Sequence, residues 1–177
     1  MKILKTLTLV VTLLFCTTTF SQTKKDRKII ADAAKAKTTL IKTEKGLEPF
    51  FENSAGYVIF PNVGKGGFVI GAASGNGAVY EKGELIGMAN LKKLNIGFQA
   101  GGQAIIEVIF FETKTELERF KNNEFQFDAQ ASAVAIKSGI AFNAKYKEGV
   151  ATFALPKSGL MADASVGGQK FKYRSIN

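Results

Sequence analysis

The sequence predicts an α+β fold, in which a curled antiparallel sheet or barrel-like core of seven or more strands packs against an N-terminal amphipathic helix. Apolar residues recur with helical spacing over residues 23–45. From Gly56 onward, apolar and polar residues alternate with the two-residue period of a strand. Short turns containing glycine separate the alternating segments, which favours antiparallel pairing over parallel βαβ units.

The helix predicted over residues 23–45 is amphipathic. Its apolar residues fall on one arc at 100° per residue, and most of its lysines fall on the opposite side. The arc holds Ile29, Ile30, Ala33, Ala34, Ala36, Leu40 and Ile41. Lys37 interrupts the arc, and Gly46 is predicted to end the helix. A second short helix is predicted over residues 47–53, with Pro49 in its first turn.

Alternation is clearest from Leu94 to Phe111. A straight strand of that length would span about 60 Å at about 3.4 Å per residue. We therefore expect it to bend or break at Gly101-Gly102. Hairpin turns are predicted at residues 74–77 and at Lys82-Gly83.

A short helix near residues 115–122 is predicted from the capping-box pattern between Thr113 and Glu116. Four more strands are expected after it, separated by turns that contain asparagine, glycine or proline. They are placed over residues 125–135, 140–147, 150–155 and 160–173.

The first 21 residues have the pattern of a secretory signal peptide. Lys2 and Lys5 precede an apolar run, which is too short to span a bilayer as a helix, and small residues precede a cut before Gln22. We expect residues 22–177 to form one domain that is secreted or periplasmic, with peripheral association to a membrane. Lipidation of Cys16 is disfavoured because the bulky Phe15 precedes it.

Composition argues against an enzyme. The chain has no histidine, and its single cysteine lies in the expected signal peptide, so the usual base of nucleophilic catalysis, a thiol nucleophile and Cys or His metal ligands are missing, although carboxylate pairs could still catalyse. The glycine-rich segment 64–67 lacks the spacing of a phosphate-binding loop. We therefore expect no metal and no cofactor.

Basic residues are the main candidates for function. Without Lys2 and Lys5, the 24 basic residues fall to 22 against 15 acidic ones, so the domain carries a net charge of +7. A secreted basic protein is expected to meet an anionic membrane rather than nucleic acid. The candidate lipid-binding residues of the helix are Lys24, Lys25, Arg27, Lys28, Lys35 and Lys42, and those of the last strand are Lys170, Lys172 and Arg174. The alternatives are that the net charge only aids solubility, and that the last strand is a face exposed to solvent or an edge guarded by lysines.

A polar row on one predicted strand face is a second candidate. Gln99, Gln103 and Glu107 recur at four-residue spacing and could line a polar cavity. The alternatives are a face exposed to solvent and a buried acid paired with a basic residue.

Three blocks of the sequence, taken in order, resemble the SYLF domain family, also called the Ysc84-type or DUF500 family. The first comprises residues 55–63 with 65–68, the second residues 96–103 with Glu107, and the third residues 159–168. The resemblance identifies the chain as a secreted, single-domain bacterial member.

This resemblance implies a phospholipid-binding module. Eukaryotic relatives bind phosphoinositides through a basic amphipathic N-terminal segment, and some bind actin, which is not carried over to a secreted protein. The resemblance adds Lys65 to the candidate lipid-binding residues. The chain departs from the family pattern at residues 84–91, where many relatives have a stretch resembling Trp-Ser-x-Pro.

The sequence thus leads to a non-enzymatic protein that binds anionic phospholipid at a membrane surface. The alternatives are a carrier of a small hydrophobic ligand and a structural or interaction protein of the cell envelope. Whether the N-terminal helix packs on the sheet or inserts into lipid stays open at this point.

Overall fold

The computed structural model describes residues 23–66, 70–96, 103–123, 126–127, 134–136, 141, 144–157 and 169–176. Its helices are α2 (Lys24–Thr43), α3 (Glu48–Asn53) and α4 (Lys114–Lys121), with a 3₁₀ turn η1 (Lys45–Leu47). The long strands are β1 (Gly56–Gly66), β2 (Ile70–Glu81), β3 (Glu84–Ile96), β4 (Gln103–Phe111), β7 (Val150–Pro156) and β8 (Gln169–Ser175). Two strands have two residues each: β5 (Gln126–Phe127) and β6 (Val134–Ala135).

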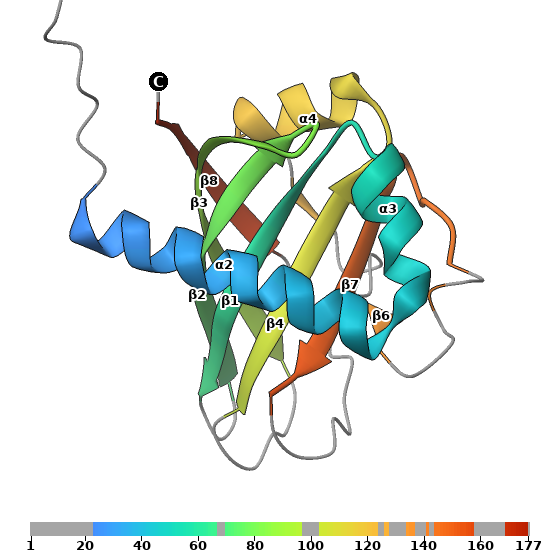
Figure 1. The fold of residues 1–177 in the computed structure, drawn as a ribbon. Coiled ribbons are helices and arrows are strands. Elements are labelled where there is room, and N and C mark those ends of the chain that lie inside the picture. Colours follow the sequence, from blue (N-terminus) through green and yellow to red (C-terminus); the bar gives the residue numbers. More distant parts are fainter. Residues whose placement is uncertain are drawn as a thin grey trace, which may run out of the picture.

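All strands belong to one sheet, in the order β5-β8-β3-β2-β1-β4-β7-β6. Every pair is antiparallel except that of the short β6, which runs parallel to β7. Helix α2 crosses one side of the sheet diagonally, and α4 lies at one end of the strands (Figure 1). The predicted α+β class and antiparallel sheet are confirmed.

The prediction of a barrel-like core with seven or more full strands is not confirmed. Six strands are longer than two residues, and the order of the described strands has two ends, β5 and β6, so the sheet is open. The strand predicted over residues 140–147 is wrong in its described part. There, Ala144 and Tyr146 pack against the hydrophobic core without forming a ladder of hydrogen bonds. Alternation reports which side chains are buried, and burial does not require strand pairing.

Several other predictions fall partly or wholly outside the described residues. These include the break at Gly101-Gly102 and the segments 128–133 and 158–168 of the predicted later strands. The long alternating segment does, however, belong to two strands: its start lies in β3, and its end is β4.

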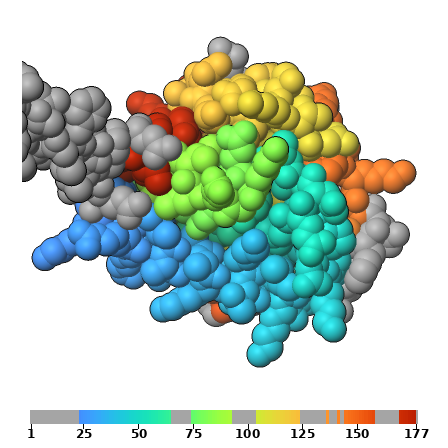
Figure 2. Space-filling view, turned by 45° about the horizontal axis from the view of Figure 1, so that its top comes forward, coloured from blue at the N-terminus to red at the C-terminus, as the bar shows by residue number. Residues whose placement is uncertain are grey.

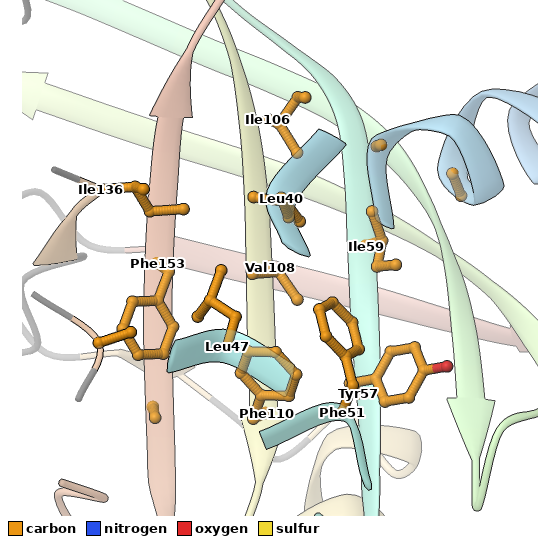
Figure 3. Close-up of a cluster of buried hydrophobic side chains, with 14 of the residues drawn as sticks. Leu40, Leu47, Phe51, Tyr57, Ile59, Ile106, Val108, Phe110, Ile136 and Phe153 are labelled. Carbon is orange, nitrogen blue, oxygen red and sulfur yellow. The ribbon is translucent and has the colours of Figure 1, made fainter. Parts of the chain in front are cut away.

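Each face of the sheet packs against its own hydrophobic core. The outer core gathers Ala33, Leu40, Leu47 and Phe51 of the N-terminal helices against the central strands. In Figure 3, Leu40, Leu47 and Phe51 lie over the side chains that β1, β4 and β7 present on this side. The inner core lies on the opposite face and includes Val58, Phe60, Ile105, Ile109, Phe111, Leu117, Phe120 and Phe171. We call these two sides the outer and inner faces.

The inner face is concave. Phe60 of β1 and Phe171 of β8 are three strands apart, which corresponds to about 14 Å in a flat sheet with strands about 4.8 Å apart. Their ring centroids are nevertheless 6.0 Å apart. Phe120 of α4 lies 5.4 Å from Phe171 and 5.0 Å from Phe111. The sheet therefore curls around a chain of aromatic rings that α4 completes.

Two glycines permit this close packing, and they correct a prediction. Residues 74–77 do not form a hairpin turn but lie inside β2. A Cβ at Gly77 would lie 2.6 Å from the carbonyl oxygen of Ile59 and 2.7 Å from Cδ1 of Phe60. Gly75 is similarly close to β1. Glycine permits close approach of two strands as well as a turn, and at residues 74–77 the glycines serve the first purpose.

Local capping and turn chemistry accounts for other boundaries. Helix α2 begins with a capping box, in which the Thr23 hydroxyl accepts from Asp26 N and the Asp26 carboxylate accepts from Thr23 N. The predicted turn at Lys82-Gly83 is confirmed, since both residues have positive φ, 48° and 85°, as a two-residue hairpin requires. The helix predicted near residues 115–122 is also confirmed, and Thr113 caps it.

Candidate functional site

Five exposed basic side chains gather on the outer face, beside the start of α2. We call this set the basic face: Lys25 of α2, Lys92 of β3, and Lys170, Lys172 and Arg174 of β8. In the space-filling view, the red residues of β8 border the green residues of β2 and β3, and the blue helix α2 lies along their other side (Figure 2). The two basic segments predicted from the sequence, near its two ends, therefore meet on one surface.

Strand alternation directs these side chains outward. On β8, Phe171 is buried in the inner core, so Lys170 and Lys172 on either side of it face outward. The same pattern holds on β3, where Leu91 is buried and Asn90 and Lys92 are turned the other way. The apolar side chains of the inner core therefore fix where the charges lie.

The cross-strand register places two lysines directly opposite each other. Lys170 of β8 pairs with Lys92 of β3, and Lys172 pairs with Asn90. Like charges at directly opposite positions destabilise a sheet. A groove of about 600 Å³ is lined by these four residues together with Asn123, Phe171 and Tyr173.

A second groove, of about 550 Å³, continues from the first towards the start of α2. Both are lined by Asn90, Lys172 and Tyr173, and the second adds Lys25, Asp26, Arg174 and Asn76 among others. Among the described residues that line the two grooves, Asp26 is the only acid. Five basic side chains thus surround one carboxylate.

That carboxylate is already engaged. Nη2 of Arg174 lies 2.9 Å from Oδ1 of Asp26 and joins the last strand to the first turn of α2. Burial raises the pKa of Asp26, but hydrogen bonds from Thr23 and Arg174 outweigh it and hold the pKa below the ordinary value of 3.8. Asp26 therefore stays ionised at neutral pH and fixes the position of the helix start beside β8.

The other basic residues predicted on the helix lie elsewhere on it. Lys24 and Arg27 are exposed in the first turns, and Lys42 is exposed in the last. Lys28 pairs with Asp32 at 3.0 Å, and with Lys35 it lines a groove on the side of α2 away from β8. The structure does not bring these five residues into the basic face. The side chain of Lys65 lies outside the description.

Lys37, which interrupts the apolar arc, has a structural role. Its Nζ donates to the Tyr57 hydroxyl at 3.1 Å and lies 4.8 Å and 5.1 Å from the ring centroids of Phe51 and Tyr57. A lysine over aromatic rings can face the outer core without losing all of its polar contacts. With Ala33, Ala36 and Leu40 buried, α2 is packed on the sheet.

Glu107, the one member of the predicted polar row whose side chain is described, is not exposed to solvent. Glu107 has an exposed fraction of 0% and lies on the inner face between Phe60 and Ala154 of the neighbouring strands. Gln103 belongs to β4, but its side chain, like all of Gln99, lies outside the described residues. Glu107 is thus a buried acid, as one sequence alternative held in part; its pairing with a basic residue stays a prediction.

Several residues of the grooves were not predicted as site residues from the sequence, among them Asn76, Asn90 and Lys92. Residues 84–91, which depart from the family pattern, belong to β3. The alternation of Met88, Asn90 and Lys92 with Ala89 and Leu91 was the available signal. This alternation predicts which side chains of β3 face outward, but it does not predict that β3 pairs with β8.

The described residues contain no cluster of three or more acidic, histidine or cysteine side chains placed to hold a metal ion. Within the same part of the chain, no helix has the length and apolar character needed to cross a bilayer.

Comparison with known proteins finds similarity in the C-terminal half of the chain. Residues 92–176 match the family described as "Ysc84: Las17-binding protein actin regulator". The chain is also 30% identical over 83 residues to "Beta cell expansion factor A" of Aeromonas veronii, covering 46% of this chain and 32% of that protein. The predicted resemblance is therefore confirmed over residues 92–176, which match the Ysc84 (SYLF) family of binding domains.

The matched region contains four of the five residues of the basic face. It begins at Lys92 and includes the whole of β8, whereas α2 with Lys25 lies before it. The chain matches about a third of the length of the Aeromonas veronii protein. The activity that this protein's name indicates is therefore not assigned to the present chain.

Proposed function

We propose that this protein is a non-enzymatic binding protein that attaches to anionic phospholipid at a membrane surface through the basic face. The observation that carries the proposal is the convergence of Lys25 with Lys170, Lys172 and Arg174 on one exposed surface. The Asp26–Arg174 ion pair joins the two segments, but Asp26 is the only acid among the described residues that line the grooves, so it offsets one of the five positive charges. An anionic partner supplies a reason for the arrangement.

The electrostatic attraction of the basic face to an anionic bilayer is strong enough for reversible attachment. A basic side chain near an anionic bilayer contributes about 1 kcal/mol, so five contribute about 5 kcal/mol at low salt. That free energy corresponds to a dissociation constant of about 0.2 mM. Because the charges are exposed, the attraction is screened over about 8 Å at physiological ionic strength, and binding falls as salt rises.

The packing of α2 favours attachment with the helix in place. Its apolar residues Ala33 and Leu40 are fully buried against the sheet, and Lys37 and Asp26 hold its middle and its start. Insertion into lipid would expose the outer core, which that helix covers. We therefore propose peripheral binding by charge, with Lys24 and Arg27 adding to the attraction from the exposed side of the helix.

We extend the proposal to location. The signal-peptide pattern of residues 1–21, which precede the described residues, supports a secreted or periplasmic protein. A carrier of a hydrophobic ligand has less support, because the aromatic rings of the inner core are in mutual contact.

Co-sedimentation with vesicles tests the function. The purified protein is mixed with neutral phosphatidylcholine vesicles and with vesicles that also contain phosphatidylglycerol, at low and high salt. We expect salt-sensitive binding to the acidic vesicles. It should weaken about 100-fold when Lys25, Lys170 and Lys172 are changed to glutamine, at about fivefold for each residue.

A control of equal charge separates the basic face from net charge. Lys45, Lys114 and Lys147 are exposed and lie outside the two grooves. Their change to glutamine should leave most of the binding intact. Equal loss in both triple variants would show that only net charge matters, and failure to bind acidic vesicles at low salt would reject the function.

A further inference from the structure

A groove of about 730 Å³ lies at one end of the sheet, where three connections between elements meet. Residues 51–55 lead from α3 into β1, the turn Lys82-Gly83 joins β2 to β3, and residues 112–114 lead from β4 into α4. Helices α3 and α4 both lie at this end of the strands (Figure 1). We call it the strand-end groove, and it shares no described lining residue with the two grooves of the basic face.

Backbone hydrogen bonds hold the three connections together. Ala55 N donates to the carbonyl oxygen of Phe111 at 2.9 Å, and Lys82 N donates to the carbonyl oxygen of Ala55 at 3.4 Å. Glu112 N donates to the carbonyl oxygen of Gly149 at 2.8 Å. The side chains of the groove therefore project from a fixed base, and a site that is already ordered loses less entropy when a ligand binds.

A buried hydroxyl in this groove has no partner in the protein. Ser54 is one of the lining residues, and its exposed fraction is 7%. Within the described part of the chain, no group forms a hydrogen bond with its Oγ. A buried hydroxyl without a partner destabilises the folded state, and alanine would occupy the same space without that cost. A ligand that bonds to the hydroxyl accounts for a serine at this position.

The groove also presents charges of both signs. Glu52 and Glu112 are exposed carboxylates on its walls, and Lys82 and Lys114 are exposed ammonium groups. None of these four side chains takes part in an ion pair between described residues. A ligand of one sign would meet like charges in this groove, whereas a ligand with an ammonium group and a carboxylate can match both signs.

We propose that the strand-end groove binds a short peptide whose amino and carboxyl ends are both free. The carboxylates of Glu52 and Glu112 accept from the ammonium group of the peptide. Lys82 and Lys114 donate to its carboxylate, and the Ser54 hydroxyl bonds to its backbone. A groove of about 730 Å³ has the size of small-molecule sites and leaves room for several residues. The site is independent of the membrane function proposed above.

Titration with trialanine tests the proposal. The purified protein is followed through the backbone amide resonances of residues 55, 83 and 113, which belong to the three connections. We expect trialanine to shift these resonances and to bind more tightly than alanine, whose two charges are too close together to reach both sets of side chains. Acetylating the amino end or amidating the carboxyl end should each weaken binding about threefold to fivefold, since each removes one exposed charge contact.

Variants separate recognition from folding. Ser54→Ala should weaken trialanine binding about fivefold, while the thermal unfolding midpoint stays the same or rises, because a buried hydroxyl without a partner has been removed. The paired variant Glu52→Gln with Lys114→Gln should bind free and capped peptides equally. The control Glu84→Gln with Lys45→Gln makes the same zero change in net charge at exposed residues outside the groove and should retain the preference for free ends.

The outcomes are distinct. Weaker binding of both capped peptides, together with weaker binding by a stable Ser54→Ala variant, supports the site. Equal binding of free and capped peptides overturns recognition of the two ends. Tighter binding of alanine than of trialanine overturns the assignment to a peptide. A Ser54→Ala variant that loses stability but keeps its affinity shows a structural serine and overturns its role as a ligand contact. Absence of a shift with every probe overturns the proposal.

Discussion

Changing Gly77 to alanine tests whether the close approach of β1 and β2 sets the curl of the sheet. The new Cβ would lie 2.6 Å from the carbonyl oxygen of Ile59 and 2.7 Å from the ring of Phe60. The first of these neighbours is backbone, so it cannot turn away like a side chain. Phe60 is also the ring that reaches across to Phe171. The substitution therefore has to move β1 or to separate the two rings.

The expected loss follows from two opposing effects. Overpacking in a core costs about 1–3 kcal/mol, and a contact with backbone places this case near the upper end. Replacing glycine also reduces the entropy of the unfolded chain, which recovers about 0.4–1 kcal/mol. We expect Gly77→Ala to lower the free energy of unfolding by about 2 kcal/mol, and the midpoint temperature by about 4–8 °C for a domain of this size.

Gly64 provides the matched control. It lies in β1, and a Cβ there would meet nothing within 4 Å. Thermal and urea unfolding should show Gly64→Ala to be neutral, or more stable by about 0.5 kcal/mol. If Gly77→Ala is as stable as Gly64→Ala, the close approach of the two strands is not what the glycine provides, and our account of the curl is wrong.

Three further predictions concern other contacts. Asp26→Asn should lower the free energy of unfolding by about 1 kcal/mol at pH 7, because the helix cap and the ion pair with Arg174 are lost. The pKa of Asp26 is lowered in the folded protein, so in the wild type this contribution to stability should disappear only when the pH falls below about 3.8. Phe171→Ala should cost about 3–5 kcal/mol in urea unfolding, because the ring is buried against the rings of the inner core; a loss under 1 kcal/mol would contradict that packing. Burial raises the pKa of Tyr80 and of Tyr146 to about 12, so their phenolate absorbance should appear well above pH 10. The stability that these two neutral phenols contribute should be full below pH 10 and lost towards pH 12, whereas titration of both near pH 10 would mean that their hydroxyls are exposed.

Local patterns accounted for most of the element types. The amphipathic arc of α2, the proline start of α3, the cap at Thr113 and the turn at Lys82-Gly83 each rest on interactions within a few residues. Such interactions are encoded locally, so the sequence suffices to predict them. The errors arose where one local pattern serves two structures, as at residues 74–77, where glycine permits either a turn or a close strand.

Part of the candidate site could likewise be predicted from local sequence patterns, and part could not. The sequence indicated that Lys170, Lys172 and Arg174 share one strand face and that Lys25 begins a basic helix. It did not indicate that these segments touch, and it did not single out Lys92.

The sequence by itself thus determined the α+β class and the two basic segments, because period, turn chemistry and charge are properties of neighbouring residues. Only the tertiary structure decided that β8 pairs with β3, that Lys92 faces Lys170, and that Asp26 anchors the start of α2 to Arg174. These contacts join residues far apart in the chain. Their choice depends on how the whole inner face packs around Phe60, Phe120 and Phe171, and no short segment carries that information.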